Sequence, residues 1–259
     1  MKHQITVQVI AGEKRQVKNM EKFQVVEHFI SINGEGRRAG QLAVFIRFAG
    51  CNLSCEYCDT KWANAPETEY ESYTAPELYQ MIKRSGVRNV TLTGGEPLLQ
   101  RNMNQLLSLL RQDKELQIEI ETNGSVDIAP FMAERNAART VEEESREAGG
   151  GEDNVTFTLD YKLSASGMEE RMCLSNYSGL RSIDTVKFVA GSRADLVKSK
   201  EIIDRYGLVE KGCGIYLSPC FGKIEPREIV DFLVEQNMNG VNVQLQLHKY
   251  IWNPEQRGV

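Results

Sequence analysis

Short apolar stretches alternate with helical patterns along most of this 259-residue chain. Each apolar stretch has the length and β-branched content of a strand, and most are followed by a polar or glycine-containing turn and then a helical period. Strands that alternate with helices are joined by right-handed crossovers, which place the strands parallel in one sheet. The alternation therefore predicts an α/β fold with mostly parallel strands, arranged as a barrel or a partial (βα) barrel.

The expected elements follow from these patterns. One helix should begin after Thr74, which together with Glu77 can form a capping box, and should end before Gly86. Further helices are expected near residues 101–112, 127–139, 193–206 and 225–237. The expected strands cover residues 23–30, 43–48, 87–92, 116–121, 155–159, 185–190, 214–217 and 241–247.

The chain divides into a short extension and one large domain. Residues 1–19 are polar and β-branched, and the stronger pattern starts at Met20, so we expect a single domain over residues 20–259. A hydrophobic content of 41% in a chain of this length suffices for one substantial core. Residues 136–154 are charged and rich in glycine, which predicts a solvated, mobile insertion.

Charge and hydropathy exclude several classes of partner. The net charge of −5 and the absence of a basic patch in the sequence give no electrostatic reason to expect direct binding to nucleic acid or to an anionic membrane. No apolar run approaches the roughly 20 residues of a membrane span, and the N-terminus lacks the apolar core of a signal peptide. We therefore expect a cytoplasmic protein, in which clustered cysteines indicate metal binding or catalysis rather than disulfides.

Three of the six cysteines, Cys51, Cys55 and Cys58, form a C-x3-C-x2-C cluster on one predicted loop. A structural zinc site normally takes four protein ligands, and here the fourth would have to be His28 or His248. Three cysteines suit a four-iron cluster better, because a cubane can leave one iron without a protein ligand. The spacing favours the iron-sulfur cluster and leaves a zinc module as the alternative.

Unusual residues recur where the predicted strands end. The strand at 43–48 runs into the cysteine loop, and the later strands run into TGGEP, ETNG, DYKLSAS, SPCF and QLHK. In parallel βα folds the loops at the carboxyl ends of the strands converge on one site. We therefore expect these segments to line a common pocket.

Two motifs resemble the radical S-adenosylmethionine superfamily. They are C-x3-C-x2-C with Tyr57 just before the last cysteine, and TGGEPLL at residues 93–99. The resemblance implies that the three thiolates hold a [4Fe-4S] cluster whose open iron binds S-adenosylmethionine and cleaves it reductively to a 5′-deoxyadenosyl radical. Gly94 and Gly95 would admit the methionyl amine, Glu96 would offer a carboxylate to a cation, and Tyr57 would lie against the adenine.

Four further segments resemble one family, the 7-carboxy-7-deazaguanine synthases of queuosine and deazapurine biosynthesis. They are FISINGEGRRAGQLAVFIRFAGC, CDTKW, the region at 160–168, and LQLHKYIW, and the likeness covers roughly residues 21–259. The resemblance implies a lyase that converts 6-carboxy-5,6,7,8-tetrahydropterin to 7-carboxy-7-deazaguanine. Hydrogen abstraction from C6 would start a ring contraction that expels ammonia, with Mg²⁺ orienting the substrate.

The resemblance also assigns residues around the substrate. Thr60, in CDT, would bind Mg²⁺ through its hydroxyl, a sparse protein contribution that suits this ion. Glu35, Arg47 and His248 would act in catalysis, with Arg47 pairing with the substrate carboxylate or ring oxygens. The full substrate-binding set would be Ile32, Asn33, Gly34, Glu35, Arg47, Thr93 and His248.

Two more strand-end segments match cofactor-contacting positions of the family only in part. The first segment usually reads Ser-Pro-Lys in the family. Here it reads Asp160, Tyr161 and Lys162, so only the lysine is kept. The second segment, which often begins Gln-Pro in the family, is Ser218, Pro219, Cys220 and Phe221 here. Many family members end soon after the histidine that matches His248, whereas this chain continues through NPEQRGV.

The implied partners are the small-molecule substrate, an electron donor such as flavodoxin or ferredoxin, and a second copy of the chain in a homodimer. The alternative within the superfamily is an activase that installs a glycyl radical on a large enzyme. INGEG, Arg47 and LQLHK favour an enclosed small polar substrate instead.

Overall fold

A nine-stranded sheet organises the protein, for which a computed structural model describes residues 21–132, 153–253 and 256–259. The strand order is β3-β1-β2-β4-β5-β6-β7-β8-β9, and all neighbours from β2 to β9 are parallel. The strands are β1 (Phe23–Ile32), β2 (Leu42–Phe48), β3 (Glu71–Tyr73), β4 (Asn89–Gly94), β5 (Gln117–Thr122), β6 (Val155–Tyr161), β7 (Thr185–Ala190), β8 (Gly214–Pro219) and β9 (Asn242–Val243).

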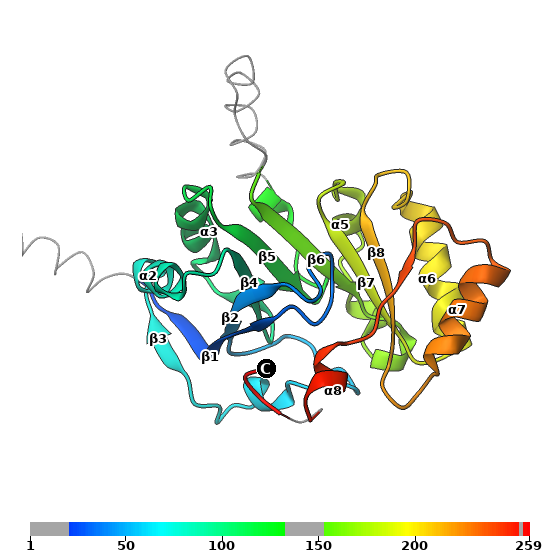
Figure 1. Cartoon of the computed structure of the whole chain (residues 1–259), viewed down its shortest axis with the longest axis horizontal. Helices are drawn as coiled ribbons and strands as arrows, with labels where there is room; N and C mark the ends of the chain where they lie inside the picture. Colours follow the sequence, from blue (N-terminus) through cyan, green and yellow to red (C-terminus); the bar gives the residue numbers. More distant parts are fainter. Residues whose placement is uncertain (1–20, 133–152, 254–255) are drawn as a thin grey trace, which may run out of the picture.

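Helices connect the parallel strands and cover the outside of the curved sheet. Figure 1 shows α2 and α3 at one end of the sheet and α6 and α7 at the other. The α-helices are α2 (Ala75–Ser85), α3 (Met103–Arg111), α5 (Ser175–Ser178), α6 (Arg193–Tyr206), α7 (Pro226–Glu235) and α8 (His248–Ile251). Short 3-10 helices are η1 (Lys61–Asn64), η2 (Pro97–Leu99), η4 (Ser164–Ser166) and η5 (Glu169–Arg171).

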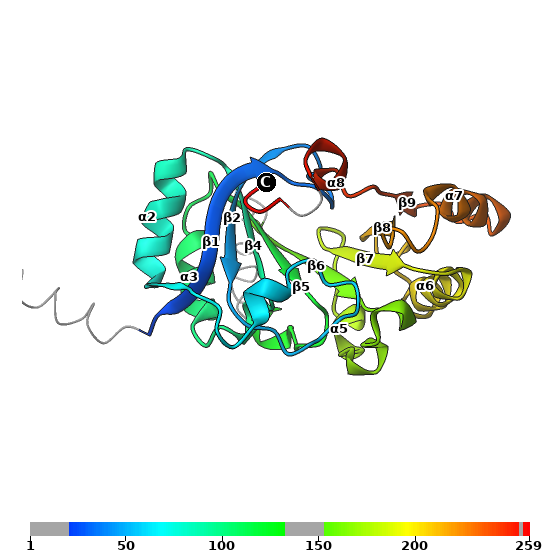
Figure 2. The ribbon, with the colours of Figure 1, turned by 90° about the horizontal axis from the view of Figure 1, so that it is seen from below.

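The sheet curves without closing, which makes it a partial barrel. The first strand, β1, is antiparallel to both β2 and β3, and the described residues contain no pairing between β3 and β9. The loop after β1 spans the opening instead: Gly36 and the Gln244 side chain exchange two hydrogen bonds of 2.7 and 3.1 Å, and the Leu247 amide donates to the Gly34 carbonyl at 3.1 Å. Figure 2 shows the C-terminal segment and α8 near the end of β1, on this open side.

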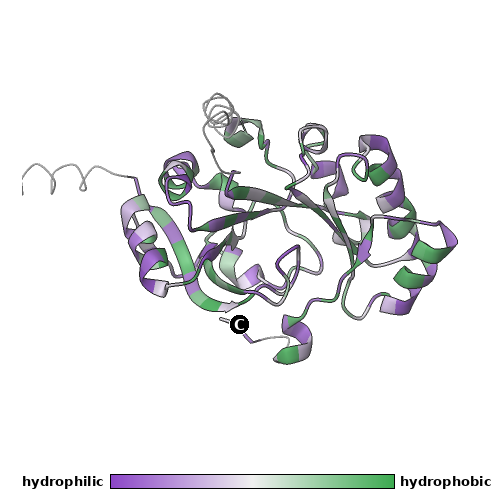
Figure 3. Cartoon of the chain, turned by 45° about the horizontal axis from the view of Figure 1, so that its top comes forward, coloured by the Kyte–Doolittle hydropathy of each residue, from purple (hydrophilic) through white to green (hydrophobic). Residues whose placement is uncertain are grey.

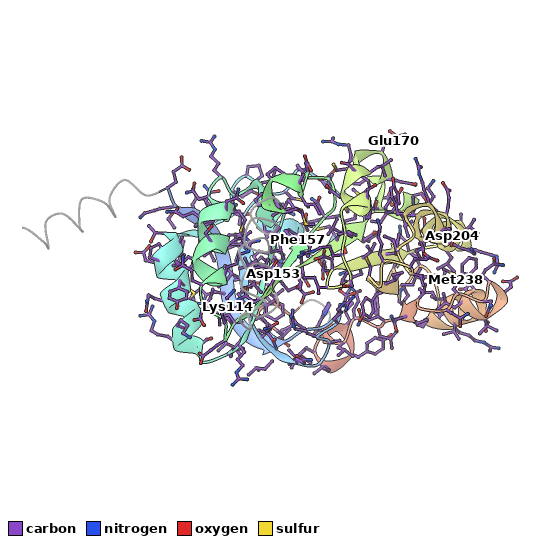
Figure 4. All side chains as sticks on the ribbon, turned by 90° about the horizontal axis from the view of Figure 1, so that it is seen from above. Lys114, Asp153, Phe157, Glu170, Asp204 and Met238 are labelled. Carbon is purple, nitrogen blue, oxygen red and sulfur yellow. The ribbon has the colours of Figure 1, made fainter. Side chains whose placement is uncertain are left out.

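The core lies between the strands and the outer helices. Apolar residues that are 0% exposed, such as Ile46, Leu92, Ile118 and Phe157, lie along the central strands. Figure 3 shows hydrophobic colour along these strands and mixed colour on the helices, and Figure 4 places Phe157 inside and Asp204 and Met238 at the α6–α7 end. The loops at the carboxyl ends of the strands are thereby fixed to a rigid base.

The predicted elements are largely confirmed. The residue bounds 185–190 and 193–206 are those of β7 and α6, and α2 has the expected capping box, with the Glu77 carboxylate accepting from the Thr74 amide at 2.7 Å. Gly86 ends α2 with φ 68°, a left-handed conformation that favours glycine. Other bounds move by one to two residues, as in β4 and β8.

One predicted strand was wrong in extent, and one strand was not predicted. The strand expected at 241–247 pairs with β8 only over Asn242–Val243, because Leu247 turns its amide to the loop after β1. The edge strand β3 was not expected, since three residues carry too little pattern.

Two predicted segments fall largely outside the described residues. The helix expected at 127–139 is described as helical only from Ala129 to Met132. Of the insertion expected at 136–154, only Asp153 and Asn154 are described; Asn154 is buried and its amide group donates to the carbonyls of Asp113 and Leu116. Asn154 is therefore fixed to the segment between α3 and β5, and β6 begins at Val155 as expected. Among the described residues, no helix is long and apolar enough to cross a membrane.

Candidate active site

A cavity of about 760 Å³ opens at the carboxyl ends of the parallel strands. Residues that follow β2, β4, β5, β6 and β8 line it, together with side chains of β1 and β7 and the C-terminal segment. The strand-end segments singled out from the sequence therefore meet in one place, as parallel topology requires. The cavity contains both the cysteine motif and most of the predicted substrate residues.

The cysteine loop forms part of the cavity wall, and Cys51, Cys55 and Cys58 all line the cavity. The loop leaves β2 at Gly50, whose φ of 84° suits glycine. The Cys51 sulfur accepts hydrogen bonds from the Leu53 amide at 3.4 Å and from the Asn123 side chain at 3.5 Å. Such N–H donors stabilise a sulfur that carries negative charge.

Burial raises the pKa of the Cys51 and Cys55 thiols above their ordinary value. Thiolates at these positions therefore need a cation, which bound iron supplies. Three soft sulfur donors on one loop, with N–H groups directed at one of them, fit a [4Fe-4S] cluster.

The zinc alternative would need His28 or His248 as its fourth ligand. In the described part of the chain, no three His, Cys, Asp or Glu side chains converge closely enough to hold a single metal ion. A cubane places its three thiolates on three different irons, so it does not need that convergence. His28 does not line the cavity, and its ring lies edge-on to Tyr73 at 6.2 Å.

The glycine pair after β4 brings the second motif against the cysteine loop. A Cβ on Gly95 would lie 2.0 Å from the Gly50 carbonyl oxygen, and one on Gly94 would lie 2.3 Å from the Phe48 carbonyl oxygen. The same backbones are joined by hydrogen bonds from Gly95 N to Phe48 O (3.1 Å) and from Glu96 N to Gly50 O (2.9 Å). The glycines are thus required for close packing of the two motifs, whatever ligand lies beside them.

Glu96 does not face the cavity. Its side chain is fully buried, and its carboxylate accepts from the Asn123 amide (2.7 Å), the Leu98 amide (3.0 Å) and the Thr122 hydroxyl (2.9 Å). Burial raises its pKa to about 7 despite these donors. The side chain therefore braces the ends of β4 and β5 against each other.

Tyr57 lines the cavity, and burial raises the pKa of its phenol. Its hydroxyl is buried and has no hydrogen-bond partner within the described residues. Contact of its ring with adenine stays a prediction.

Thr60 and Asp59 line the cavity directly after the third cysteine. The Thr60 hydroxyl lies 3.6 Å from the Cys58 sulfur, while the Asp59 carboxylate, which is half exposed, lies 4.0 Å from the Lys249 ammonium group. The predicted magnesium ligand is therefore next to the predicted cluster.

Arg47 and Glu35 both line the cavity, but they have different partners. The Arg47 guanidinium donates to the Glu27 carboxylate at 2.7 Å, a pairing between neighbouring strands β1 and β2. Glu35 accepts from the ammonium group of Lys187 at 3.0 Å, from Gln246 at 3.3 Å and from the Ser218 hydroxyl at 3.3 Å. Glu35 is thereby held by residues far along the chain.

The INGEG loop is divided between the cavity and the interior. Ile32, Gly34 and Glu35 line the cavity, whereas Asn33 is buried and accepts from the Thr91 hydroxyl at 2.9 Å. The Asn33 side chain therefore does not reach the cavity.

His248 also lines the cavity, and it lies directly against Gly34. A Cβ on Gly34 would lie 2.6 Å from its Nδ1 atom. Burial lowers the pKa of His248, although Glu35 and Asp59 oppose this shift. The imidazole is therefore neutral at neutral pH and can both donate and accept a hydrogen bond.

The Asp160–Lys162 segment sends alternate side chains to opposite sides. Asp160 and Lys162 line the cavity and form an ion pair of 2.5 Å. Burial alone would raise the pKa of Asp160, but the ammonium groups of Lys162 and Lys187 outweigh it and lower the pKa. Tyr161 points into the core, where its ring packs on Tyr177.

The second partially matching segment, residues 218–221, is also divided between the cavity and the interior. Cys220 and Phe221 line the cavity, Ser218 is buried and reaches Glu35, and Pro219 is not among the lining residues. Phe221 is 60% exposed at the rim, and the Lys249 ammonium group lies 5.7 Å from its ring centre.

Sequence reasoning missed Glu121 and Lys187, both of which line the cavity. The Thr93 hydroxyl donates to Glu121, and burial raises the pKa of this carboxyl to about 7, with Glu119 and Glu35 adding to the effect of burial and Lys187 opposing it. The available signal was a charged residue within an otherwise apolar strand pattern, IEIET and TVKFVA. The C-terminal residues Gln256 to Val259 were left open and also line the cavity.

Comparison with known proteins identifies the family of the chain. The radical SAM superfamily model matches residues 45–159. The chain is 50% identical to the 7-carboxy-7-deazaguanine synthase of Clostridium acetobutylicum, over 92% of this chain and 99% of the relative. It is 34% identical to the enzyme of that name from Chlorobaculum tepidum, over 91% of this chain and 96% of the relative.

A solved structure shows the same fold. The crystal structure of QueE from Escherichia coli superposes with a TM-score of 0.59, covering 90% of this chain and 98% of that chain, at 21% identity. The identity over nearly the whole length of the curated relatives, together with the cysteine and glycine motifs on one cavity, shows that this chain belongs to the 7-carboxy-7-deazaguanine synthase family of radical SAM enzymes.

Proposed function

We propose that this protein converts 6-carboxy-5,6,7,8-tetrahydropterin to 7-carboxy-7-deazaguanine, with loss of ammonia, in queuosine or deazapurine biosynthesis. The observation that carries the proposal is the meeting of two sets of residues in one cavity: the three cysteines, and the polar residues Glu35, Arg47, Glu121 and His248. The cluster and S-adenosylmethionine would supply the radical that removes hydrogen from the substrate. The remaining work of the protein is to orient the substrate and to exclude water.

The polar groups of the cavity match the two ends of such a substrate. Glu35 and Glu121 present carboxylate acceptors to the N–H groups of its guanidine-like edge, and Arg47 presents a guanidinium group to its carboxylate. Binding the substrate carboxylate would require Arg47 to share its contact with Glu27. Neutral His248 would hold a ring oxygen or nitrogen without adding charge.

Cofactor contacts would come from a second set of lining residues. Gly94 and Gly95 would offer backbone groups to the methionyl amine, with Tyr57 beside the adenine. Asp160, Lys162 and Cys220 would contact the nucleoside part. Glu96 would act through the backbones that it braces.

Mg²⁺ would bind at Thr60, with substrate oxygens and water as its other ligands. The Thr60 hydroxyl is at the cavity wall beside Cys58, where an ion could bridge the protein and the substrate carboxylate. We expect Thr60→Ala to raise the Mg²⁺ concentration needed for half-maximal activity by about tenfold, the effect of roughly one lost ligand. An unchanged Mg²⁺ response would remove Thr60 from this role, and Thr68→Ala, outside the cavity lining, is the control.

The electron donor would be a flavodoxin or a ferredoxin. A second hollow of about 600 Å³ is lined by residues of the cysteine loop and of the segment after β6, and Cys51 and Leu53 border both hollows. Glu170, on the rim of this second hollow, projects from the surface in Figure 4. The loop therefore separates the substrate cavity from a surface that a donor can approach. We also propose that the protein forms a homodimer. We propose a cytoplasmic location, because free cysteines that bind a cluster suit a reducing compartment.

The deciding experiment is anaerobic incubation of the reconstituted protein with reductant, S-adenosylmethionine, Mg²⁺ and 6-carboxytetrahydropterin. The expected products are 5′-deoxyadenosine and 7-carboxy-7-deazaguanine, identified by mass spectrometry. Formation of 5′-deoxyadenosine without the deazaguanine would reject the substrate assignment but leave the radical chemistry intact.

A further inference from the structure

Lys187 is a mostly buried cation among the charged residues that line the cavity. It lies on β7 between two buried apolar residues, Val186 and Phe188, and its side chain is 11% exposed. Its ammonium group is 3.0 Å from a Glu35 oxygen and 3.5 Å from an Asp160 oxygen. It therefore joins the side of the cavity proposed for substrate to the side proposed for cofactor.

Four charges alternate through this contact. Glu35 pairs with Lys187, Lys187 pairs with Asp160, and Asp160 pairs with Lys162 at 2.5 Å. Burial by itself would lower the pKa of Lys187, but Asp160, Glu35 and Glu121 outweigh it and raise the pKa well above the ordinary value. The ammonium group is thus a permanent charge within the cavity wall.

The position of Glu35 depends on partners from three distant segments. Its carboxylate accepts from Lys187 of β7, from Ser218 of β8 and from Gln246 in the C-terminal segment. Of these partners only Lys187 carries a positive charge, which makes its bond the strongest of the three.

We propose that Lys187 is a positioning residue for the substrate: it holds the Glu35 side chain in place to accept hydrogen bonds from the guanidine-like edge of the pterin. This inference rests on the proposed function. A buried charge at this site has a desolvation cost that a hydrophobic side chain would avoid. The cost is offset when the charge fixes a side chain that must bind ligand, because Glu35 held in one position presents its oxygens as acceptors to the substrate.

The test is a double-mutant cycle on the reconstituted holoenzyme, read by equilibrium binding of 6-carboxytetrahydropterin under anaerobic conditions with Mg²⁺ and S-adenosylmethionine. We expect Lys187→Met to raise the substrate Kd at least about tenfold. The iron content, and the Kd for S-adenosylmethionine measured without substrate, should stay within about twofold of the wild-type values. A merely structural role would change these two quantities as well as the substrate Kd.

The cycle is completed with Glu35→Gln and the double variant. Because Lys187 acts through Glu35, adding Lys187→Met to Glu35→Gln should change the Kd by less than about threefold. Lys187→Arg, which keeps the charge, should recover most of the affinity. Lys198→Met is the matched control, since Lys198 also pairs with two carboxylates but does not line the cavity, and it should bind substrate as the wild type does.

Three results would overturn the inference. They are an unchanged substrate Kd in Lys187→Met, multiplying effects in the double variant, and equal weakening by Lys187→Arg and Lys187→Met. If Lys187→Met does not fold, Lys187→Gln replaces it, because glutamine can still donate to Glu35 but lacks the charge, and wild-type affinity in that variant also overturns the inference. If the wild-type protein itself does not bind the pterin, the proposed function fails as well, so the two failures are distinguishable.

Discussion

The side of the cavity built on β2 and β4 differs from the side built on β6, β7 and β8 in how its residues are brought together. On the first side, the cysteine loop and the glycine pair are held by backbone hydrogen bonds and by contacts too close for any Cβ, as at Gly95. On the second side, side chains pair over long separations, 152 residues for Lys187 with Glu35 and 211 for Gln246 with Glu35.

The difference separates two tasks. The radical generator needs a fixed backbone around a cluster and an aminoacyl group, and short motifs can specify that backbone. The substrate needs charges placed around a flat heterocycle, and these come from strands that meet only after folding. Changes on the first side should therefore abolish function outright, whereas changes on the second should alter affinity and pH dependence.

The largest effect is expected for Cys55→Ala. Loss of one of three thiolates should leave the cluster without stable ligation, so the purified protein should contain little iron and should not cleave S-adenosylmethionine. Iron analysis and visible absorbance after anaerobic reconstitution check this result. Cys213→Ala, a change at a buried cysteine outside the cavity lining, should retain the iron. Full cluster content in Cys55→Ala would contradict the assignment.

A smaller but still severe effect is expected for Gly95→Ala. The added methyl group would lie 2.0 Å from the Gly50 carbonyl oxygen, so the two motifs must separate, at a cost of about 1–3 kcal/mol of stability. S-Adenosylmethionine binding should weaken at least about tenfold, measured by equilibrium dialysis of the reconstituted protein. Gly179→Ala, where the nearest atom is 3.6 Å away, should behave as the wild type. Unaltered binding in Gly95→Ala would show that the motifs can separate without loss.

At Glu121, which lies on β5 between the two sides, Glu121→Gln should change the pH dependence of stability. Burial raises the pKa of Glu121 from 4.5 to about 7. Between these values the folded protein binds a proton that the unfolded chain has released, so the free energy of unfolding falls as pH rises through this window. Above pH 7 the variant should be more stable than the wild type by roughly 1–3 kcal/mol.

Denaturant unfolding of the reconstituted protein at pH 5, 6, 7 and 8 measures that difference. Glu210→Gln, at an exposed position, should follow the wild-type curve. Parallel curves for Glu121→Gln and the wild type would show that Glu121 titrates normally.

The smallest effect is expected at the C-terminal segment. The Arg257 guanidinium lies 4.0 Å from the centre of the Trp62 ring, and both residues line the cavity. Arg257→Ala should lower the free energy of unfolding by about 0.5–1 kcal/mol and should change the tryptophan fluorescence. Arg205→Ala, which removes a similar contact with Tyr206 away from the cavity, should lower stability comparably without a change in substrate KM. A KM effect equal in both variants would exclude a role for the segment in substrate binding.

Much of the fold was predictable because its signals are local. The bounds of β7 and α6 follow from apolar periodicity and capping, and the Thr74–Glu77 box marks the start of α2. The strand expected at 241–247 was wrong because its backbone hydrogen bonds go partly to the loop after β1, which periodicity does not register. The edge strand β3 depends on pairing with β1 rather than on its own three residues.

The site likewise has one part that local sequence signals predict and one part that depends on the folded sheet. The sequence by itself determined the cysteine loop, the glycine pair and their common location, because motif spacing and parallel topology are enough to specify them. Only the tertiary structure decided that Glu96 braces the backbone, that Asn33 and Tyr161 face the interior, and that Lys187 pairs with Glu35. The reason is physical: the side of a strand on which a charged residue lies, and the partner that offsets its desolvation, depend on segments brought together only by the complete sheet.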